Sequence, residues 1–282
     1  MKQKQVISHL IYPERKNGMS SKDIIFQNAL DWVTQVGEMI KARMNEEIEV
    51  EFKTGHSDLV TSLDREVETY LVNKIRELYP SHNILGEENI GNFESADPNL
   101  WMIDPIDGTS NFVNRKKDFG VCMAFCKEGK GVFGIIYNVV DGKLFYAKKG
   151  EGAFFNGTRL EALNQSSRLE NELIAVNIPW KDKSVLSNWR PLFRLGRAAR
   201  GVREYGASVI DLTDIAMGYL GGLAQFHIQP WDYAAGRIIL EELGCVFSDL
   251  KGNVINMTYS GPLVAGCGRV YEDMIQTMNT VE

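Results

Sequence analysis

Two carboxylates stand close together in the segment Leu100–Phe112, which reads LWMIDPIDGTSNF. Asp104 and Asp107 follow an apolar run typical of a strand, and the Pro and Gly beside them bend the chain. Thr109 or Ser110 is placed to cap a following helix. Mg²⁺ prefers oxygen ligands, and a phosphate oxyanion is favoured where the N–H groups of a helix start converge. This loop therefore predicts a site for metal and phosphate, although a capped turn explains the same residues when they are taken alone.

Three other acidic segments could likewise be either metal ligands or ordinary structural residues such as helix caps. Glu87 and Glu88 follow the apolar pair Ile84-Leu85, just past an expected strand end. Asp232 introduces a helix of small residues, and Asp64 stands at the start of an amphipathic helix. Asp is among the preferred residues at a helix N-cap, so capping alone explains Asp64 and Asp232 when each is considered by itself.

Taken together, the four segments resemble the inositol monophosphatase family of metal-dependent phosphatases. The family patterns D-P-[IL]-D-G-T, G-E-E and W-D-x-A-x-G all occur unbroken, as does a K…D-x-V-T-x-x-D stretch that begins at Lys53 and contains Asp58. The match runs from Lys53 to Gly236, and the joint occurrence is far more specific than any single pattern. The resemblance implies a layered α/β sandwich (αβαβα, the sugar-phosphatase fold), with the site between an N-terminal α+β half that contains an antiparallel sheet and a C-terminal α/β half.

The resemblance also implies a set of metal ligands. One Mg²⁺ would be held by Glu87, Asp104 and the backbone carbonyl of Ile106, and a second by Asp104, Asp107 and Asp232. A third, looser ion would be reached by Glu87 through water. This implied set of ligands agrees with the chemistry of metal-assisted hydrolysis. Metal coordination lowers the pKa of water, and paired cations stabilise both the attacking and the leaving oxygen of an in-line displacement.

Catalytic and substrate-binding roles follow from the same resemblance. Asp64 and Thr109 would orient and deprotonate the attacking water, together with Glu87 at the metal. Preorganised N–H donors would stabilise the transferring phosphoryl group. The implied substrate-binding residues are Gly108, Thr109, Gly206, Ala207, Ser208, Gln225 and Asp232.

Gln225 departs from the pattern, because many inositol-preferring members have a glutamate at this position. An amide still binds hydroxyl groups but carries no charge, so the alcohol part of the substrate stays open. The run from Asp107 to Phe112 favours the inositol monophosphatase branch. The expected substrate is an inositol monophosphate-type ester, and the alternatives are NADP, fructose 1,6-bisphosphate and 3′-phosphoadenosine 5′-phosphate. A remote alternative is a non-catalytic sugar-phosphate-binding protein.

Two other phosphatase classes fit poorly. Haloacid-dehalogenase enzymes need a nucleophilic aspartate two residues before the second acid, where this chain has Pro105. The sequence also has no G-x-x-x-x-G-K-[ST] phosphate-binding loop.

Composition limits which kinds of partner and which cellular location we expect. The 282-residue chain has a formal net charge of −6, which gives no basic footprint for a nucleic acid polymer. No apolar stretch is long enough to span a membrane, so we expect a cytoplasmic protein. The dispersed Cys122, Cys126, Cys245 and Cys267 form no C-x-x-C pair, and we expect reduced core thiols. A homodimer and inhibition by Li⁺ are expected from the resemblance alone.

Periodicity then supplies the elements that would carry these residues. Helical patterns are expected at 20–44, 64–78, 189–195, 207–217, 233–243 and 270–278, with strands at 48–53, 84–85, 100–103, 119–126, 132–139, 143–148, 152–155, 174–177, 223–227, 246–247 and 263–264. The strands after residue 83 read as an antiparallel meander. We expect an N-terminal extension at 1–18, an α+β metal-binding half at 19–160 and an α/β half at 161–282.

Overall fold

The computed structural model describes residues 20–52, 59–91, 97–178, 180 and 190–280. The predicted extension at 1–18, the motif residues Lys53 and Asp58 and the predicted helix start at 189 lie outside these ranges. The helices of the described part are α2 (Ser21–Arg43), α3 (Ser62–Leu78), α4 (Thr109–Arg115), α6 (Arg190–Ala198), α7 (Ser208–Ala216), α8 (Pro230–Glu241) and α9 (Gly268–Asn279), with the 3₁₀ helix η1 (Leu169–Asn171). Its strands are β1 (Val50–Phe52), β2 (Leu59–Thr61), β3 (Asn83–Gly86), β4 (Asn99–Asp107), β5 (Gly120–Lys127), β6 (Lys130–Asn138), β7 (Lys143–Lys148), β8 (Gly152–Phe155), β9 (Thr158–Arg159), β10 (Leu173–Asn177), β11 (Gly201–Arg203), β12 (Gly222–Gln225), β13 (Cys245–Ser248) and β14 (Leu263–Cys267).

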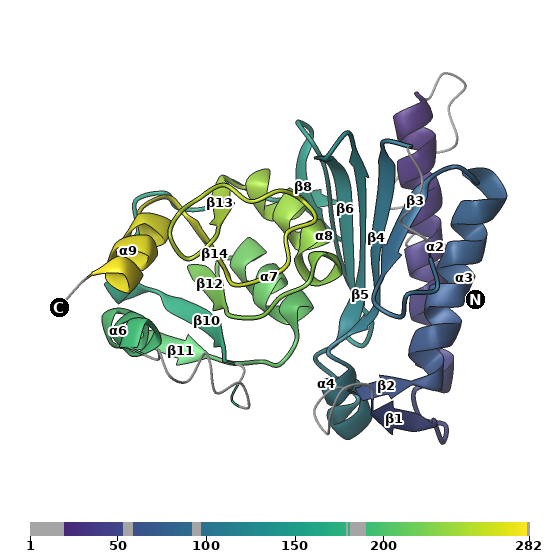
Figure 1. Ribbon diagram of the computed structural model, residues 1–282, viewed down its shortest axis with the longest axis horizontal. Coiled ribbons are helices and arrows are strands. Elements are labelled where there is room, and N and C mark those ends of the chain that lie inside the picture. Colours follow the sequence, from purple (N-terminus) through teal and green to yellow (C-terminus); the bar gives the residue numbers. More distant parts are fainter. Residues whose placement is uncertain (1–19, 53–58, 92–96, 179, 181–189, 281–282) are drawn as a thin grey trace.

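These elements stack in five layers (Figure 1). Helices α2 and α3 cover one face of the sheet β3–β9, and α7 and α8 lie between that sheet and the sheet β10–β14. Helices α6 and α9 cover the outer face of the second sheet. The order helix, sheet, helix, sheet, helix confirms the predicted α/β sandwich.

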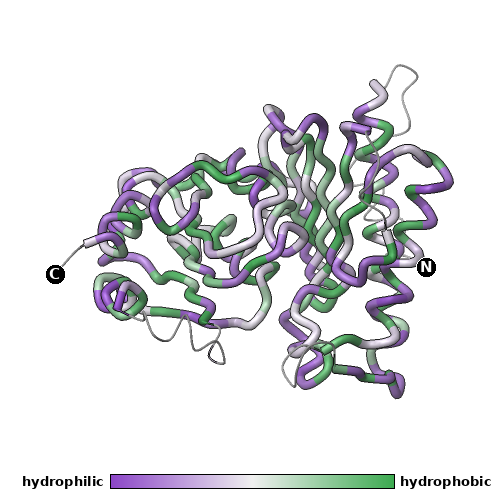
Figure 2. The backbone as a smooth tube through the Cα atoms, in the orientation of Figure 1, coloured by the Kyte–Doolittle hydropathy of each residue, from purple (hydrophilic) through white to green (hydrophobic). Residues whose placement is uncertain are grey.

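The first sheet buries both of its faces. Along β4, Leu100 and Met102 point to the core shared with α7 and α8, whereas Trp101 and Ile103 point to the core shared with α2 and α3. This explains why the strand reads as a continuous apolar run instead of an alternating one. Figure 2 shows the same arrangement, with hydrophobic residues concentrated along the strands and alternating with hydrophilic ones along α2 and α3.

The strand order corrects one prediction. Strands β4 to β8 form the expected antiparallel meander, which the unpredicted β9 extends, but β3 pairs with β4 in parallel, with Gly86 beside Ile103. Strand β4 therefore runs in the same direction as β3. The carboxyl end of β3 therefore meets the middle of β4.

The second sheet is mixed, with β11-β10-β12 parallel and β14 antiparallel to both β12 and β13. Small residues allow α8 to approach the first sheet closely: a Cβ on Gly134 of β6 would lie 2.3 Å from the carbonyl oxygen of Ala235. Helix α8 is thereby held against both sheets, and its N-terminal turn lies near the end of β4.

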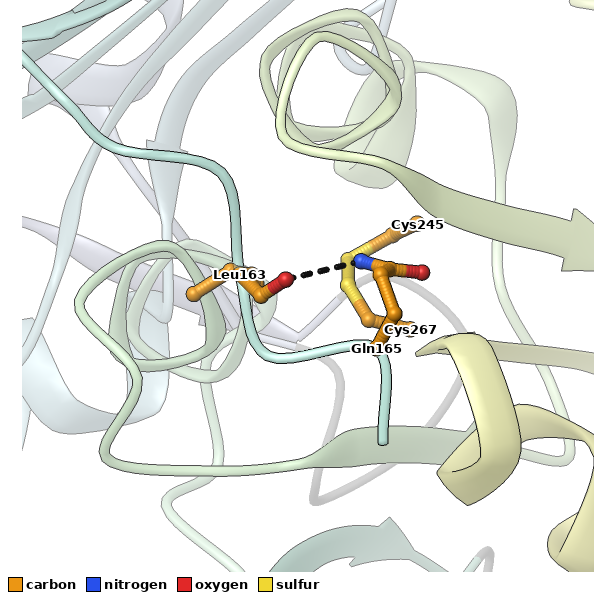
Figure 3. The surroundings of a disulfide bond; sticks show 4 residues. All are labelled: Leu163, Gln165, Cys245 and Cys267. Atoms are coloured by element: carbon orange, nitrogen blue, oxygen red, sulfur yellow. Dashed lines mark hydrogen bonds between the residues drawn. A yellow bond between two sulfur atoms is a disulfide. The ribbon is translucent and has the colours of Figure 1, made fainter. Parts of the chain in front are cut away.

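The prediction of four reduced thiols is wrong for two of them. Cys245 on β13 and Cys267 on β14 are directly opposite in the antiparallel register and form a disulfide. The segment Leu163–Gln165, which joins the two halves, passes beside it (Figure 3), and the Gln165 carbonyl accepts a hydrogen bond from Arg269 N. Cys245 and Cys267 are 22 residues apart in the sequence, and no short cysteine motif indicates that they pair. Cys122 and Cys126 are free and buried, as predicted.

Among the helices of the described ranges, none combines the length and the apolar character needed to cross a bilayer.

Candidate active site

A cavity of about 440 Å³ lies between the end of β4 and residues of β10, β12, α7 and α8. It is lined by Leu59, Glu87, Asp104, Ile106, Asp107, Gly108, Thr109, Ser110, Asn177, Ile178, Glu204, Gly206, Ala207, Ser208, Gln225, His227 and Asp232. All predicted site residues except Asp64 are among them. Four segments that are far apart in the sequence therefore meet at one place, as the family patterns require.

The end of β4 forms the floor of this cavity. The pairing of β4 with β5 is irregular between Asp104 and Asp107, and both carboxylates line the cavity. Gly108 follows with φ +88°, a left-handed conformation that favours glycine, and it is the N-cap of α4. The prediction that Thr109 or Ser110 caps this helix is wrong. Thr109 instead is its first residue, and its Oγ1 donates to the carbonyl of Ile106 over 3.0 Å.

Asp104 is a buried carboxyl group surrounded by other carboxyl groups. Its side chain is buried, and its Oδ1 has no hydrogen-bond partner among the described residues. Burial raises the pKa of this carboxyl well above its ordinary value, and the charges of Glu87, Asp107 and Asp232 raise it further. A buried carboxylate among like charges is stable in ionised form only with a cation beside it.

The donor set fits a hard cation such as Mg²⁺, because it offers oxygen atoms only. Within the described ranges, no three acidic, histidine or cysteine side chains are already arranged as ligands of one ion. One reason is that Asp107 and Asp232 each use an oxygen on backbone N–H groups.

Asp107 connects the two halves of the protein. Its Oδ2 accepts a hydrogen bond from Val209 N, and Ser208 N also donates to this carboxylate, both at the start of α7. Burial raises the pKa of Asp107 to about 7, although these two backbone donors act in the opposite direction. A loop of the first half is therefore attached to the helix start of the second.

Asp232 is not the N-cap of α8, as capping alone would suggest. Gln229 is the N-cap, and Asp232 is the third residue of the helix, whose Oδ2 accepts from Gln229 N at 2.9 Å. Pro230 at the first position fixes the helix start. The helix therefore begins three residues earlier than its apolar periodicity predicts, and its first turn presents Asp232 to the cavity.

Asp64 lies behind the cavity floor and is fully buried. It completes a capping box with Thr61, whose backbone N donates to Asp64 Oδ2 at 2.9 Å and whose hydroxyl donates to the same oxygen. Thr109 Oγ1 lies 3.2 Å from Asp64 Oδ1. Burial raises the pKa of Asp64 to about 6. Asp64 thus contacts the cavity through Thr109, and the T-x-x-D spacing was the signal that could have identified Thr61.

The opposite wall carries the neutral hydrogen-bonding groups of Ser208 and Gln225 together with the carboxylate of Glu204. Ser208 lies just after Ala207, the N-cap of α7, and its hydroxyl accepts from Gln225 Nε2 at 3.2 Å. Asn111 of α4, which the sequence analysis missed, donates to the carbonyls of Asp118 and Tyr205 and fixes this wall relative to the floor.

Glu204 and His227 also line this side and were missed. Glu204 accepts hydrogen bonds from Ile178 N at 3.3 Å and Trp180 Nε1 at 3.2 Å. Neither belongs to a short motif, so only their tertiary position identifies them.

Known proteins are similar to this chain in sequence and in structure. The sequence model of the inositol monophosphatase family matches residues 22–281. The inositol-1-monophosphatase of Bacillus subtilis is 32% identical over 249 residues, which cover 88% of this chain and 94% of that protein. The fructose-1,6-bisphosphatase/inositol-1-monophosphatase of Thermotoga maritima is 32% identical over 247 residues, covering 88% and 93%. A solved structure of an IMPase/NADP phosphatase complexed with Mg²⁺ and phosphate has a TM-score of 0.83 at 28% identity, covering 93% of this chain and 97% of that chain.

A layered α/β fold with a carboxylate-lined cavity between its halves is the architecture of a metal-dependent hydrolase. The family match makes the assignment narrower: this chain belongs to the inositol monophosphatase family and is a phosphoric monoester hydrolase.

Proposed function

We propose that this protein hydrolyses phosphate monoesters of small hydroxyl-rich alcohols, of the inositol monophosphate type, in a Mg²⁺-dependent reaction. The observation that carries the proposal is the buried Asp104 carboxylate, whose Oδ1 has no partner in the described part of the chain and which shares one cavity with four other carboxylates, those of Glu87, Asp107, Glu204 and Asp232. Such a group needs a cation, and its oxygen neighbours select a hard one.

The residues that would hold Mg²⁺ are those implied by the family patterns. Glu87, Asp104 and the carbonyl of Ile106 would bind the first ion, and Asp104, Asp107 and Asp232 the second. Glu87 would also reach a third ion through water. Bound Mg²⁺ would lower the pKa of the attacking water and offset charge on the phosphoryl group and the leaving oxygen.

The chain itself would position the reactants. Thr109 Oγ1, held between Asp64 and the Ile106 carbonyl, would orient the attacking water. Asp64 would accept the proton of this water through the hydroxyl group of Thr109. The backbone N–H groups of Gly108 and Thr109 would bind the phosphoryl oxygens. Asp232 would contact the substrate from the first turn of α8.

The leaving group would lie against Gly206, Ala207, Ser208 and Gln225. These residues offer hydroxyl, amide and backbone groups, which suit an uncharged alcohol. Glu204 is the carboxylate on this side of the cavity, so a second phosphate placed here would meet like charge. This favours a monophosphate of a neutral polyol. The relative from Thermotoga maritima is named as a fructose-1,6-bisphosphatase, and one similar solved structure is named as an NADP phosphatase. Fructose 1,6-bisphosphate and NADP are therefore the second candidate substrates. The fourth ester to be tested is 3′-phosphoadenosine 5′-phosphate.

The test is phosphate release by the purified protein with Mg²⁺ on these four esters. We expect inositol 1-phosphate to have the highest kcat/KM, and Asp104→Asn to abolish release on all four. Asp141→Asn, an exposed aspartate paired with Lys143, is the matched control and should behave as wild type. Preference for another ester would retain the mechanism and replace the substrate. Silence on all four would favour the non-catalytic sugar-phosphate-binding alternative.

We also propose a homodimer and a cytoplasmic location, and a division of the chain at residue 160 into a metal-binding half and a half that completes the site. The dimer rests on analogy with the family, and sedimentation analysis would test it. Cell fractionation would test the location.

A further inference from the structure

Glu68 of α3 is a buried carboxylate outside the predicted site. It is 0% exposed and lies on the helix that covers the sheet near β3. No cation pairs with it among the described residues. A fully buried carboxylate in an apolar core costs folding free energy, so its position calls for a specific partner.

The partners of Glu68 are two backbone N–H groups of the loop that carries Glu87. Oε2 accepts from Glu88 N at 2.7 Å, and Oε1 accepts from Ile90 N at 2.9 Å. The two oxygens thus take one donor on each side of Asn89, whose φ of +57° marks the turn between them. One carboxylate therefore fixes the direction of the chain immediately after Glu87.

The start of this loop is fixed from the other side. Glu87 N donates to the carbonyl of Ile103 on β4, one residue before Asp104. Gly86 lies against the Glu68 carboxylate: a Cβ there would be 2.4 Å from Oε1 and 2.5 Å from Cδ. Helix α3 and strand β4 together clamp the residues on either side of Glu87.

We infer that Glu68 is a positioning residue that holds the Glu87 loop in the orientation needed to bind Mg²⁺. The inference rests on the proposed role of Glu87 as a metal ligand. Groups that orient a metal ligand change metal affinity by about 10–100-fold when they are removed. Glu68 acts through Glu87 and touches neither substrate nor metal.

Glu68→Gln is the sharpest variant, because it keeps the shape of the side chain. Glutamine has one acceptor oxygen in place of two, and its NH₂ group would face one of the two N–H donors. We expect the Kd for Mg²⁺, measured by calorimetry on the purified protein without substrate, to rise about 10–100-fold. The Mg²⁺ concentration for half-maximal phosphate release should rise in parallel, while KM for the ester at saturating Mg²⁺ stays within twofold.

Gly86→Ala perturbs the same contact from the loop side and removes no charge. Its methyl group would push the loop away from Glu68, so Mg²⁺ binding should weaken in this variant too, and it decides the matter if Glu68→Gln does not fold. Leu71→Ala is the matched control, since Leu71 is a fully buried residue of α3 that packs in the core and not on the loop. It should lower the melting temperature and leave the Kd for Mg²⁺ unchanged.

Wild-type Mg²⁺ affinity in Glu68→Gln, or an equal loss in Leu71→Ala, would overturn the inference. If the wild-type protein binds Mg²⁺ but releases phosphate from no ester, the proposed function fails while the binding comparison still decides the role of Glu68. If the wild-type protein binds no Mg²⁺, both are wrong.

Discussion

Replacing Gly108 by alanine tests whether the two halves of the site are in steric register. Gly108 has φ +88°, and a Cβ at this position would lie 2.7 Å from the Cβ of Ala207. The left-handed conformation costs an alanine about 1–2 kcal/mol, and forcing two carbons to this distance adds roughly 1–3 kcal/mol. Gly108→Ala should therefore lower the free energy of unfolding by about 2–5 kcal/mol in urea titrations.

The second variant separates these two contributions. Ala207→Gly removes the opposing methyl group and should cost less than about 1 kcal/mol, because glycine is favoured over alanine at a helix N-cap. In the double variant only the backbone strain remains, so the coupling energy should be about 1–3 kcal/mol in favour of the pair.

Activity provides a second readout of the same contact. Gly108 belongs to the turn proposed to bind the phosphoryl group, so its displacement should lower kcat/KM by about 100-fold. The double variant should recover part of this loss. If it is no better than Gly108→Ala alone in stability and activity, the contact between the two loops is not what constrains this position.

Other expected outcomes depend on separate features. Reducing the disulfide Cys245–Cys267, which closes a separation of 22 residues, should lower the free energy of unfolding by about 3 kcal/mol; a count of four free thiols in denaturant without reductant would contradict the pairing. Burial raises the pKa of Asp211 to about 7 in the folded state, above its ordinary value of 3.8. The folded state therefore retains this proton longer than the unfolded state, and its stability falls as pH rises between these two values. Urea titrations should show wild type losing roughly 2 kcal/mol relative to Asp211→Asn from pH 5 to pH 7, and parallel curves would refute this. Li⁺ at millimolar concentration should inhibit phosphate release in competition with Mg²⁺, and unchanged rates would remove Li⁺ sensitivity while the enzyme class stands.

The function of the short motifs could be predicted from the sequence because the residues that act together in each motif are close in the chain. The carboxylates of the Asp104–Asp107 loop are followed closely by their own turn and helix start, so residue type and spacing predicted a metal and phosphate site. Most helices and strands were also predicted within a few residues, since apolar periodicity reflects burial on one face. The helix starts at Gly108 and Pro230 were less well predicted, because backbone conformation and a capping box outweighed the apolar pattern.

What the sequence determined by itself is therefore the family and the reaction class, and it predicted the acidic residues that line the cavity, except Glu204. Only the tertiary structure decided which groups hold those residues in place. Asp107 is bound by Val209, 102 residues away, and Glu68 by the loop at Glu88, 20 residues away. Such contacts leave no periodic or motif signal, because each depends on how whole layers pack. The same reason explains the disulfide at Cys245 and the acid at Glu204: both follow from strand register and cavity shape, which are properties of the assembled fold.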